Sequence, residues 1–143
     1  MDGDGEARES LEALTRALKL KGQVWFYGAC YDEYQLAQLI YDADLCVSPG
    51  NVGLTAIHVM MYGCPVITND DFDHQMPEFE AIQKGRTGEF FKNGDVQSLA
   101  DTIYSWLHSH SYQRDSIRLT CYKEIDEKWN PYYQMKVIKT VLK

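Results

Sequence analysis

The stretch CVSPGNVGLTAIHVMMYGCPVITND, residues 46–70, constrains the fold more than any other part of the chain. Its two short apolar segments are typical of buried strands, and the apolar segment between them, 53–62, is typical of a buried helix that Gly63 ends. Apolar strands without alternation belong to parallel sheets that are covered on both faces. The stretch therefore predicts a parallel sheet with helices on either side.

The same alternation of strands and helices continues along the chain. We expect at least four parallel strands, near residues 23–28, 44–48, 64–68 and 88–92. We expect helices over 7–20, 32–43, 95–109 and 131–142, and a short helix near 77–84. The predicted class is α/β, a three-layer, Rossmann-like parallel sheet with helices on both faces, without repeats or linkers.

Composition and charge exclude several classes of protein. The 143 residues carry a net charge of −7 with a pI near 5.0, which argues against nucleic acid as a partner because phosphate contacts need clustered Lys and Arg. No apolar run is long enough to span a membrane, and the acidic, polar start is unlike a signal peptide. Cys30, Cys46, Cys64 and Cys121 form no CxxC pair, so we expect reduced thiols in a cytoplasmic protein, without zinc or disulfides.

Polar residues gather where the predicted strands end. The segments are 28–32, 48–53 and 68–75, and ligands of open parallel sheets bind at this edge. Gly50 and Gly53 allow close approach of the backbone to a ligand, and the helix that follows offers free N–H groups and its positive dipole end. The loop thus suits a phosphate group. A tight turn without any ligand explains it equally well.

Several short motifs carry a family resemblance. In order along the chain they are VWFYG, ADLCVSP, VGLTAI, YGCPVIT, PEFEAI, GRTGEFF and GDVQSLADTI. Together they resemble the donor-binding half of the retaining GT-B glycosyltransferases of group 1, from residue 2 to about residue 107. The resemblance implies transfer of a sugar from a nucleotide diphosphate sugar to an acceptor, with retention, in glycan or polysaccharide biosynthesis. It implies neither a metal nor another cofactor.

The resemblance also implies which residues contact the donor. Those assigned to the diphosphate and sugar are Gly50, Asn51, Val52, Gly53, Leu54 and Thr55; Ala29 and Cys30 would meet the base. His58 would contact the ribose, and Glu78 of the PE motif would face the sugar. It assigns no catalytic residue.

Three of these residues have a structural alternative. His58 could be a core histidine, and we expect a neutral ring in either role because a helix N-terminus disfavours the imidazolium. Thr55 could cap its own helix, and Glu78 could be a helix-start carboxylate. The family usually has two glutamates, eight residues apart, at the positions of Gly50 and His58, so this is a variant site in which Asn51 is close enough to reach a sugar.

The start of the chain departs from the family pattern. The family's donor domain opens with a strand ending G-R-L, a lysine and a strand ending G-D-G, whereas this chain begins MDGDGE. We therefore expect residues 1–143 to be a partial nucleotide-sugar-binding domain without its first strands and its N-terminal acceptor domain. Alone it should be inactive, and marginally stable or self-associated. Peripheral membrane association of the full enzyme is a further expectation.

Other functions fit parts of the pattern. One alternative is a non-catalytic nucleotide-binding module on the same scaffold. Another is a flavodoxin-like or receiver-like signalling domain with Asp70 or Asp71 as its phosphorylated residue. His74 lies among aspartates, but the spacing fits no standard metal site, so we expect a solvated loop.

Overall fold

The computed structural model describes residues 5–142, which fall into two compact units. Unit 1 comprises Met1–Gln38 and unit 2 Leu39–Lys143.

Unit 1 contains α1 (Arg8–Ala17) and the beginning of α2 (Glu33–Asp42), both close to their predicted places. Asp32 caps α2, since its Oδ1 accepts the N–H groups of Tyr34 at 2.9 Å and Gln35 at 3.2 Å. The strand predicted at 23–28 is wrong: that segment has only an isolated bridge between Lys21 and Val24. A strand needs a hydrogen-bonded neighbour, and residues 5–38 hold no second strand to provide one.

Unit 2 is built on a parallel sheet of β1 (Cys46–Ser48), β2 (Val66–Asn69) and β3 (Gly88–Phe91) in that order. Cys46 pairs with Val66, and Val66 with Gly88. All four residues of β2, the central strand, are buried. The other three predicted strands are thus confirmed.

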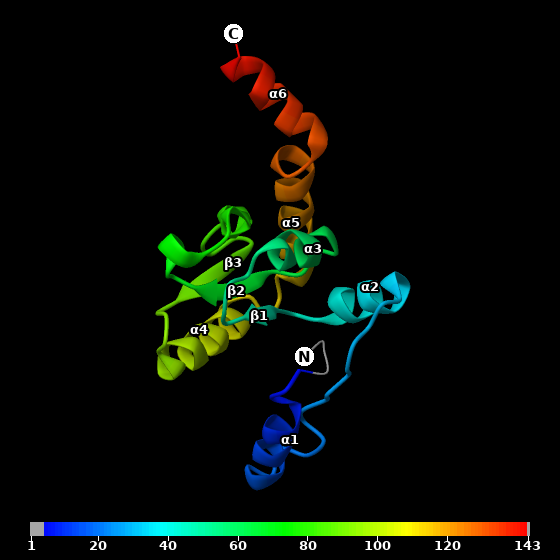
Figure 1. The fold of residues 1–143 in the computed structure, drawn as a ribbon, viewed down its shortest axis with the longest axis vertical. Helices are drawn as coiled ribbons and strands as arrows, with labels where there is room; N and C mark the ends of the chain where they lie inside the picture. The colour runs from blue at the N-terminus through cyan, green and yellow to red at the C-terminus, as the bar shows by residue number, and fades with distance from the viewer. Residues whose placement is uncertain (1–4, 143) are drawn as a thin grey trace. The chain divides into compact units, whose positions relative to one another are not determined.

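Helices cover both faces of this sheet (Figure 1). α3 (Leu54–Met61) packs on α5 (Arg114–Lys128) and on the 3-10 turn η2 (Pro77–Ala81) on one side, and α4 (Val96–Ser109) packs under β3 on the other. A second 3-10 turn, η1 (Phe72–His74), follows β2, and α6 (Pro131–Val141) begins with Pro131 as predicted. The main buried side chains between these layers are Val52, Ala56, Met60, Val66, Ile67, Ile82, Phe91, Trp106 and Cys121. The three-layer α/β class is confirmed.

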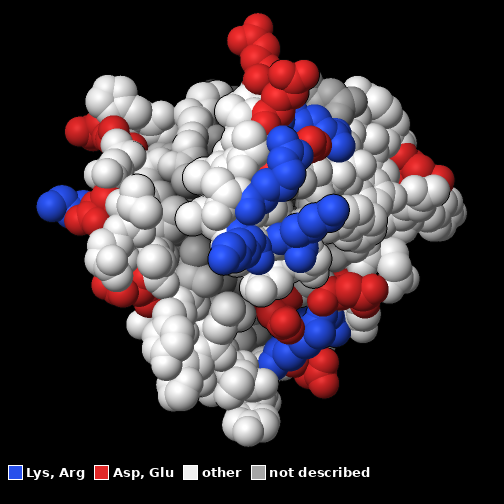
Figure 2. All heavy atoms as spheres, turned by 90° about the horizontal axis from the view of Figure 1, so that it is seen from below, with Lys and Arg blue, Asp and Glu red and all other residues white. Residues whose placement is uncertain are grey.

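The surface has mixed charge. On the face shown in Figure 2, basic side chains form a short strip that acidic side chains border. Across residues 5–142, no helix is both long enough and apolar enough to cross a membrane.

Candidate functional site

The loop between β1 and α3 leaves backbone N–H donors without an acceptor where the helix begins. Gly53 has a φ of +46°, a left-handed conformation that suits glycine, and α3 begins at the next residue. The N–H groups of Thr55 and Ala56 turn back onto the carbonyls of Val52 and Gly53, at 3.2 and 3.1 Å. Those of Gly53 and Leu54 find no hydrogen-bond acceptor within residues 5–142. Two unpaired donors at the positive end of α3 form a site that suits an oxyanion.

A second loop, residues 70–76 after β2, lies against the first one. The Gln75 side chain joins them: its Oε1 accepts the Val52 N–H at 2.9 Å, and its Nε2 donates to the Gly50 carbonyl and to Thr68 Oγ1, both at 3.2 Å. Sequence reasoning missed Gln75, because only its place after a predicted strand marks it.

Two buried polar residues at the end of β2 complete the support. Thr68 Oγ1 donates to the Gly50 carbonyl at 3.2 Å, and Asn69 Nδ2 donates to the carbonyls of Pro49 at 3.0 Å and Gly50 at 2.9 Å. Both residues are buried, so these bonds satisfy groups that would otherwise be costly to bury. The polar pair Thr68–Asn69 at the end of an apolar strand was the available signal.

Two of the predicted contact residues already form hydrogen bonds within the protein. Asn51 Nδ2 donates to the His74 carbonyl at 3.0 Å, and its Oδ1 accepts the Met76 N–H at 3.3 Å. Val52 has no free polar group, since its N–H and carbonyl are both bonded and its side chain is 2% exposed. A direct polar contact from Val52 to a donor molecule therefore does not fit this structure. A sugar contact from Asn51 stays a prediction and would require one of its bonds to open.

Thr55 and His58 both lie on α3. The Thr55 hydroxyl is exposed and has no partner among residues 5–142, so the alternative in which it caps α3 is wrong. His58 lies in the last turn of α3, with its ring edge-to-face on Tyr62 at 5.5 Å between centroids. This position lies beyond the first turn of α3, the turn in which the helix dipole acts on a nearby charge.

The remaining predicted residues are more scattered. Glu78 lies in the first turn of η2, and its buried Oε2 has no hydrogen-bond partner within the described chain. Ala29 and Cys30 belong to unit 1, on the segment that leads into α2. Their contact with a base stays a prediction.

Acidic residues of the second loop accept hydrogen bonds that hold the loop in place. Asp70 Oδ1 accepts the Asn93 N–H at 2.8 Å, and Asp71 Oδ2 accepts from Asn93 Nδ2 at 3.1 Å. Asp71 also bonds the His74 ring at 2.8 Å, and this bond and the carboxylate charge raise the pKa of His74. Residues 5–142 contain no group of three or more His, Cys, Asp or Glu suited to a metal.

The buried thiols are chemically quiet. Burial raises the pKa of Cys64 and of Cys121 to about 12. Both are therefore protonated at neutral pH and poorly suited to act as nucleophiles.

Comparisons with known proteins show which family the chain resembles. Residues 1–120 match the family described as Glycosyl transferases group 1. The chain is 29% identical over 109 residues to "Putative glycosyltransferase EpsD" of Bacillus subtilis (strain 168), which covers 74% of this chain and 27% of that protein.

Two solved structures share the fold. Sucrose-phosphate synthase (tll1590) from Thermosynechococcus elongatus aligns with a TM-score of 0.74 and 25% identity, over 98% of this chain and 35% of that one. Anabaena Alr3699/HepE, solved in complex with UDP, aligns with a TM-score of 0.71 and 20% identity, over 93% and 36%. The chain thus spans about a third of the length of these proteins.

The family match leaves the flavodoxin-like and receiver-like alternatives without support. It agrees with the parallel sheet and with the glycine loop before α3, which the sequence motifs had indicated. The chain belongs to the group 1 glycosyltransferases.

Proposed function

We propose that residues 1–143 form a partial donor-binding domain of a retaining glycosyltransferase. The domain would bind a nucleotide diphosphate sugar, and the whole enzyme, with an N-terminal acceptor domain, would pass the sugar to an acceptor in glycan or polysaccharide biosynthesis. The observation that carries this proposal is the pair of free N–H groups of Gly53 and Leu54 at the start of α3. Membership of the family supports it.

The start of α3 would act on the diphosphate. As the sugar–phosphate bond breaks, negative charge grows on the departing diphosphate. Fixed N–H donors and the helix dipole favour that charge without having to reorient. The Thr55 hydroxyl, exposed and unpaired among the described residues, would be a further donor. We assign no catalytic side chain and, from the resemblance, no metal or cofactor beyond the donor substrate.

The sugar would lie beside Gly50. A Cβ atom at Gly50 would meet no atom within 4 Å, so there is free space at this position. Glu78 supports a sugar contact, since one of its oxygens lacks a hydrogen-bond donor within residues 5–142. We retain His58 for the ribose and Ala29 and Cys30 for the base. We also propose a cytoplasmic location, which suits a chain with protonated, buried thiols. For the whole enzyme we propose peripheral association with a membrane.

A pair of variants at Leu54 tests the phosphate contact. Leu54→Pro removes one free N–H, and proline suits the first position of a helix. The preceding Gly53 has a φ of +46° and a ψ of −144°, outside the α region that a following proline disfavours. Leu54→Ala shortens the same side chain but keeps the N–H. This comparison is sharper than one at Gly53, where any side chain would strain the backbone.

We expect Leu54→Pro to bind UDP about tenfold more weakly than Leu54→Ala, the loss of one charge-assisted hydrogen bond. Isothermal titration calorimetry of the 143-residue chain measures this ratio, and circular dichroism checks that both variants keep their helix content. Equal affinities of two folded variants would contradict the proposed phosphate contact.

A further inference from the structure

We infer that Gln75 is a positioning residue that sets the direction of the two free donors at Gly53 and Leu54. This inference rests on the proposed function, since it concerns the same phosphate site. It assigns a role to a side chain on a different loop, 21 residues or more further along the sequence. Gln75 itself would not touch the ligand.

The orientation of the Gln75 amide follows from its neighbours. The Val52 N–H can only donate and the Gly50 carbonyl can only accept, so Oε1 must face Val52 and Nε2 must face Gly50. Thr68 completes a consistent set, because its hydroxyl accepts from Gln75 and donates to the same carbonyl. Both ends of the amide are therefore used.

The two bonds to the first loop lie on either side of Asn51. One holds the carbonyl of Gly50 and the other holds the N–H of Val52, so a single side chain fixes two peptide groups in succession. The next peptide groups along the chain carry the free N–H donors of Gly53 and Leu54. Because Gly53 is a flexible residue, the direction of these donors depends on what holds the residues before it.

An opposite role is conceivable for the same contact. Gln75 Oε1 could be a placeholder that a phosphate oxygen displaces from the Val52 N–H. Displacement would also break the bonds from Nε2 to Gly50 and Thr68 and would open a network that includes the buried residues Val52 and Thr68. The number of bonds that would be lost favours positioning. The two roles predict opposite effects of removing the Gln75 amide. Removal of a positioning residue would weaken UDP binding, whereas removal of a placeholder would strengthen it.

Gln75→Glu is the most informative variant. It keeps the shape of the side chain and the oxygen that accepts the Val52 N–H. An ionised carboxylate, however, cannot donate to the Gly50 carbonyl as the amide does, and the two oxygens repel each other. A protonated carboxyl can donate to that carbonyl again. The defect should therefore be large at high pH and shrink as the introduced carboxyl takes up its proton. Its pKa should lie above the ordinary value of about 4.3, because carbonyl and aspartate oxygens disfavour the charge.

The measurement is the UDP dissociation constant of the variant divided by that of the wild type, from pH 8 down to pH 5. The division removes the pH dependence that the wild type and the variant share, which includes that of UDP. His74, Asp70, Asp71 and Asp73 are the other titratable groups on the same loop. We expect a ratio of about ten at pH 8 that falls toward one at low pH. Gln134→Glu makes the same charge change on the exposed surface of α6, and its ratio should stay near one throughout. Gln75→Met, whose side chain is similar in shape, should bind UDP more weakly than the wild type at every pH.

A second readout needs no ligand. In spectra of the free chain, the amide signals of Gly53 and Leu54 should titrate in Gln75→Glu and not in Gln134→Glu. If these signals titrate but the wild type binds no UDP, the positioning stands and the proposed function fails. If the wild type binds UDP, a pH-independent ratio near one for Gln75→Glu, or unchanged or tighter binding by Gln75→Met, would overturn the inference. So would amide signals of Gly53 and Leu54 that do not respond to the variant.

Discussion

At the scale of single residues, Gly63 decides how closely α5 approaches α3. It follows the end of α3 with a φ of +77°, and a Cβ there would lie 2.2 Å from Arg118 Cγ. Arg118 has little freedom to move: its guanidinium lies 3.7 Å from the centre of the Tyr41 ring and donates to the Tyr41 carbonyl at 2.8 Å. Only glycine fits both the backbone conformation and this contact.

Gly63→Ala and Gly85→Ala separate these two requirements. Gly85 has a similar φ of +71°, but a Cβ there would meet no atom within 4 Å. We expect Gly85→Ala to lower the free energy of unfolding by about 1–2 kcal/mol through backbone strain. Gly63→Ala should lower it by a further 1–3 kcal/mol or so, because it overpacks the contact with Arg118. Urea unfolding of both variants measures the difference, and equal losses would show that the contact yields without cost.

Sequence reasoning reached the glycines of the phosphate loop but not the residues that hold it. Gly50 and Gly53 stand next to an apolar helix, so their role is visible locally. Gln75 and Asn69 act on carbonyl and N–H groups 19 or more residues away, and no local pattern specifies such a bond. Val52 was assigned to the ligand by its place in a motif, yet its backbone groups are used within the protein.

At the scale of elements, most helices were predicted close to their ranges because their pattern is local, whereas α5 was given no range. α3 and α4 lie within one or two residues of their expected ranges, and Asp95 caps α4 by accepting the Ser98 N–H at 3.0 Å. A strand depends on a neighbour instead. The apolar segment at 23–28 had strand composition, but within unit 1 no partner strand completes it.

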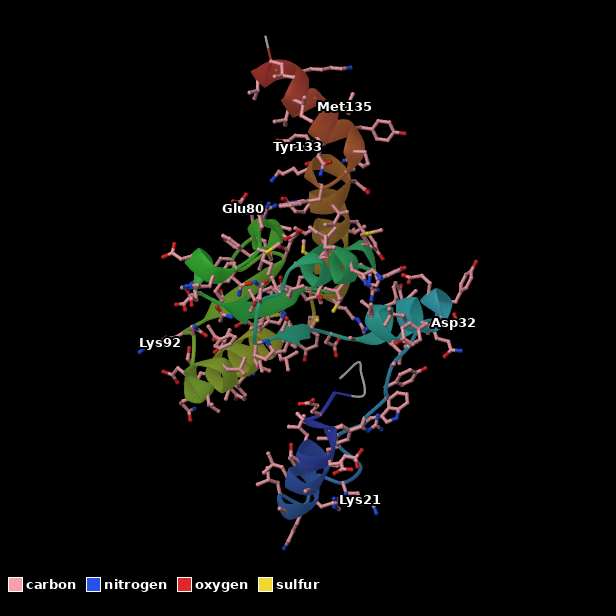
Figure 3. All side chains as sticks on the ribbon, viewed as in Figure 1. Lys21, Asp32, Glu80, Lys92, Tyr133 and Met135 are labelled. Carbon is pink, nitrogen blue, oxygen red and sulfur yellow. The ribbon has the colours of Figure 1, made fainter. Side chains whose placement is uncertain are left out.

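α6 is an α-helix whose residues are all exposed. None of its residues is buried: Ile138 and Val141 are 51% and 77% exposed, and Leu142, the residue that follows the helix, is 81% exposed. Figure 3 labels Tyr133 and Met135, two more side chains of this helix. Spacings of three and four residues put Ile138, Val141 and Leu142 on one side of the helix, which leaves an apolar surface in water.

We expect this surface to make the isolated chain self-associate. Sedimentation velocity at high protein concentration should give a mass above the 16.5 kDa of the monomer. The double variant Ile138→Lys, Leu142→Lys should return it to the monomer, because charges on the apolar side oppose contact. Thr140→Lys adds charge away from that side and serves as the control. A wild type that stays monomeric throughout would contradict this expectation.

At the scale of the whole molecule, the length of the chain limits which part of the proposed function can be tested on it. The chain spans about a third of the relatives it matches, so acceptor choice and turnover belong to the proposals for the whole protein. The property that can be tested on this chain is binding of the proposed donor. The described residues hold a parallel sheet, a helix start with free donors and a polar framework beneath them.

The most direct test is a map of amide chemical shifts as UDP is added to the 143-residue chain. The account predicts saturable shifts that are largest at Gly53 and Leu54, extend over residues 50–58, and include Ala29 and Cys30. Gly85 and Gln134, remote from these segments in the sequence, should not move. Saturable shifts centred outside residues 28–31 and 50–58, or none at millimolar UDP, would contradict the claim that the start of α3 is a nucleotide diphosphate site.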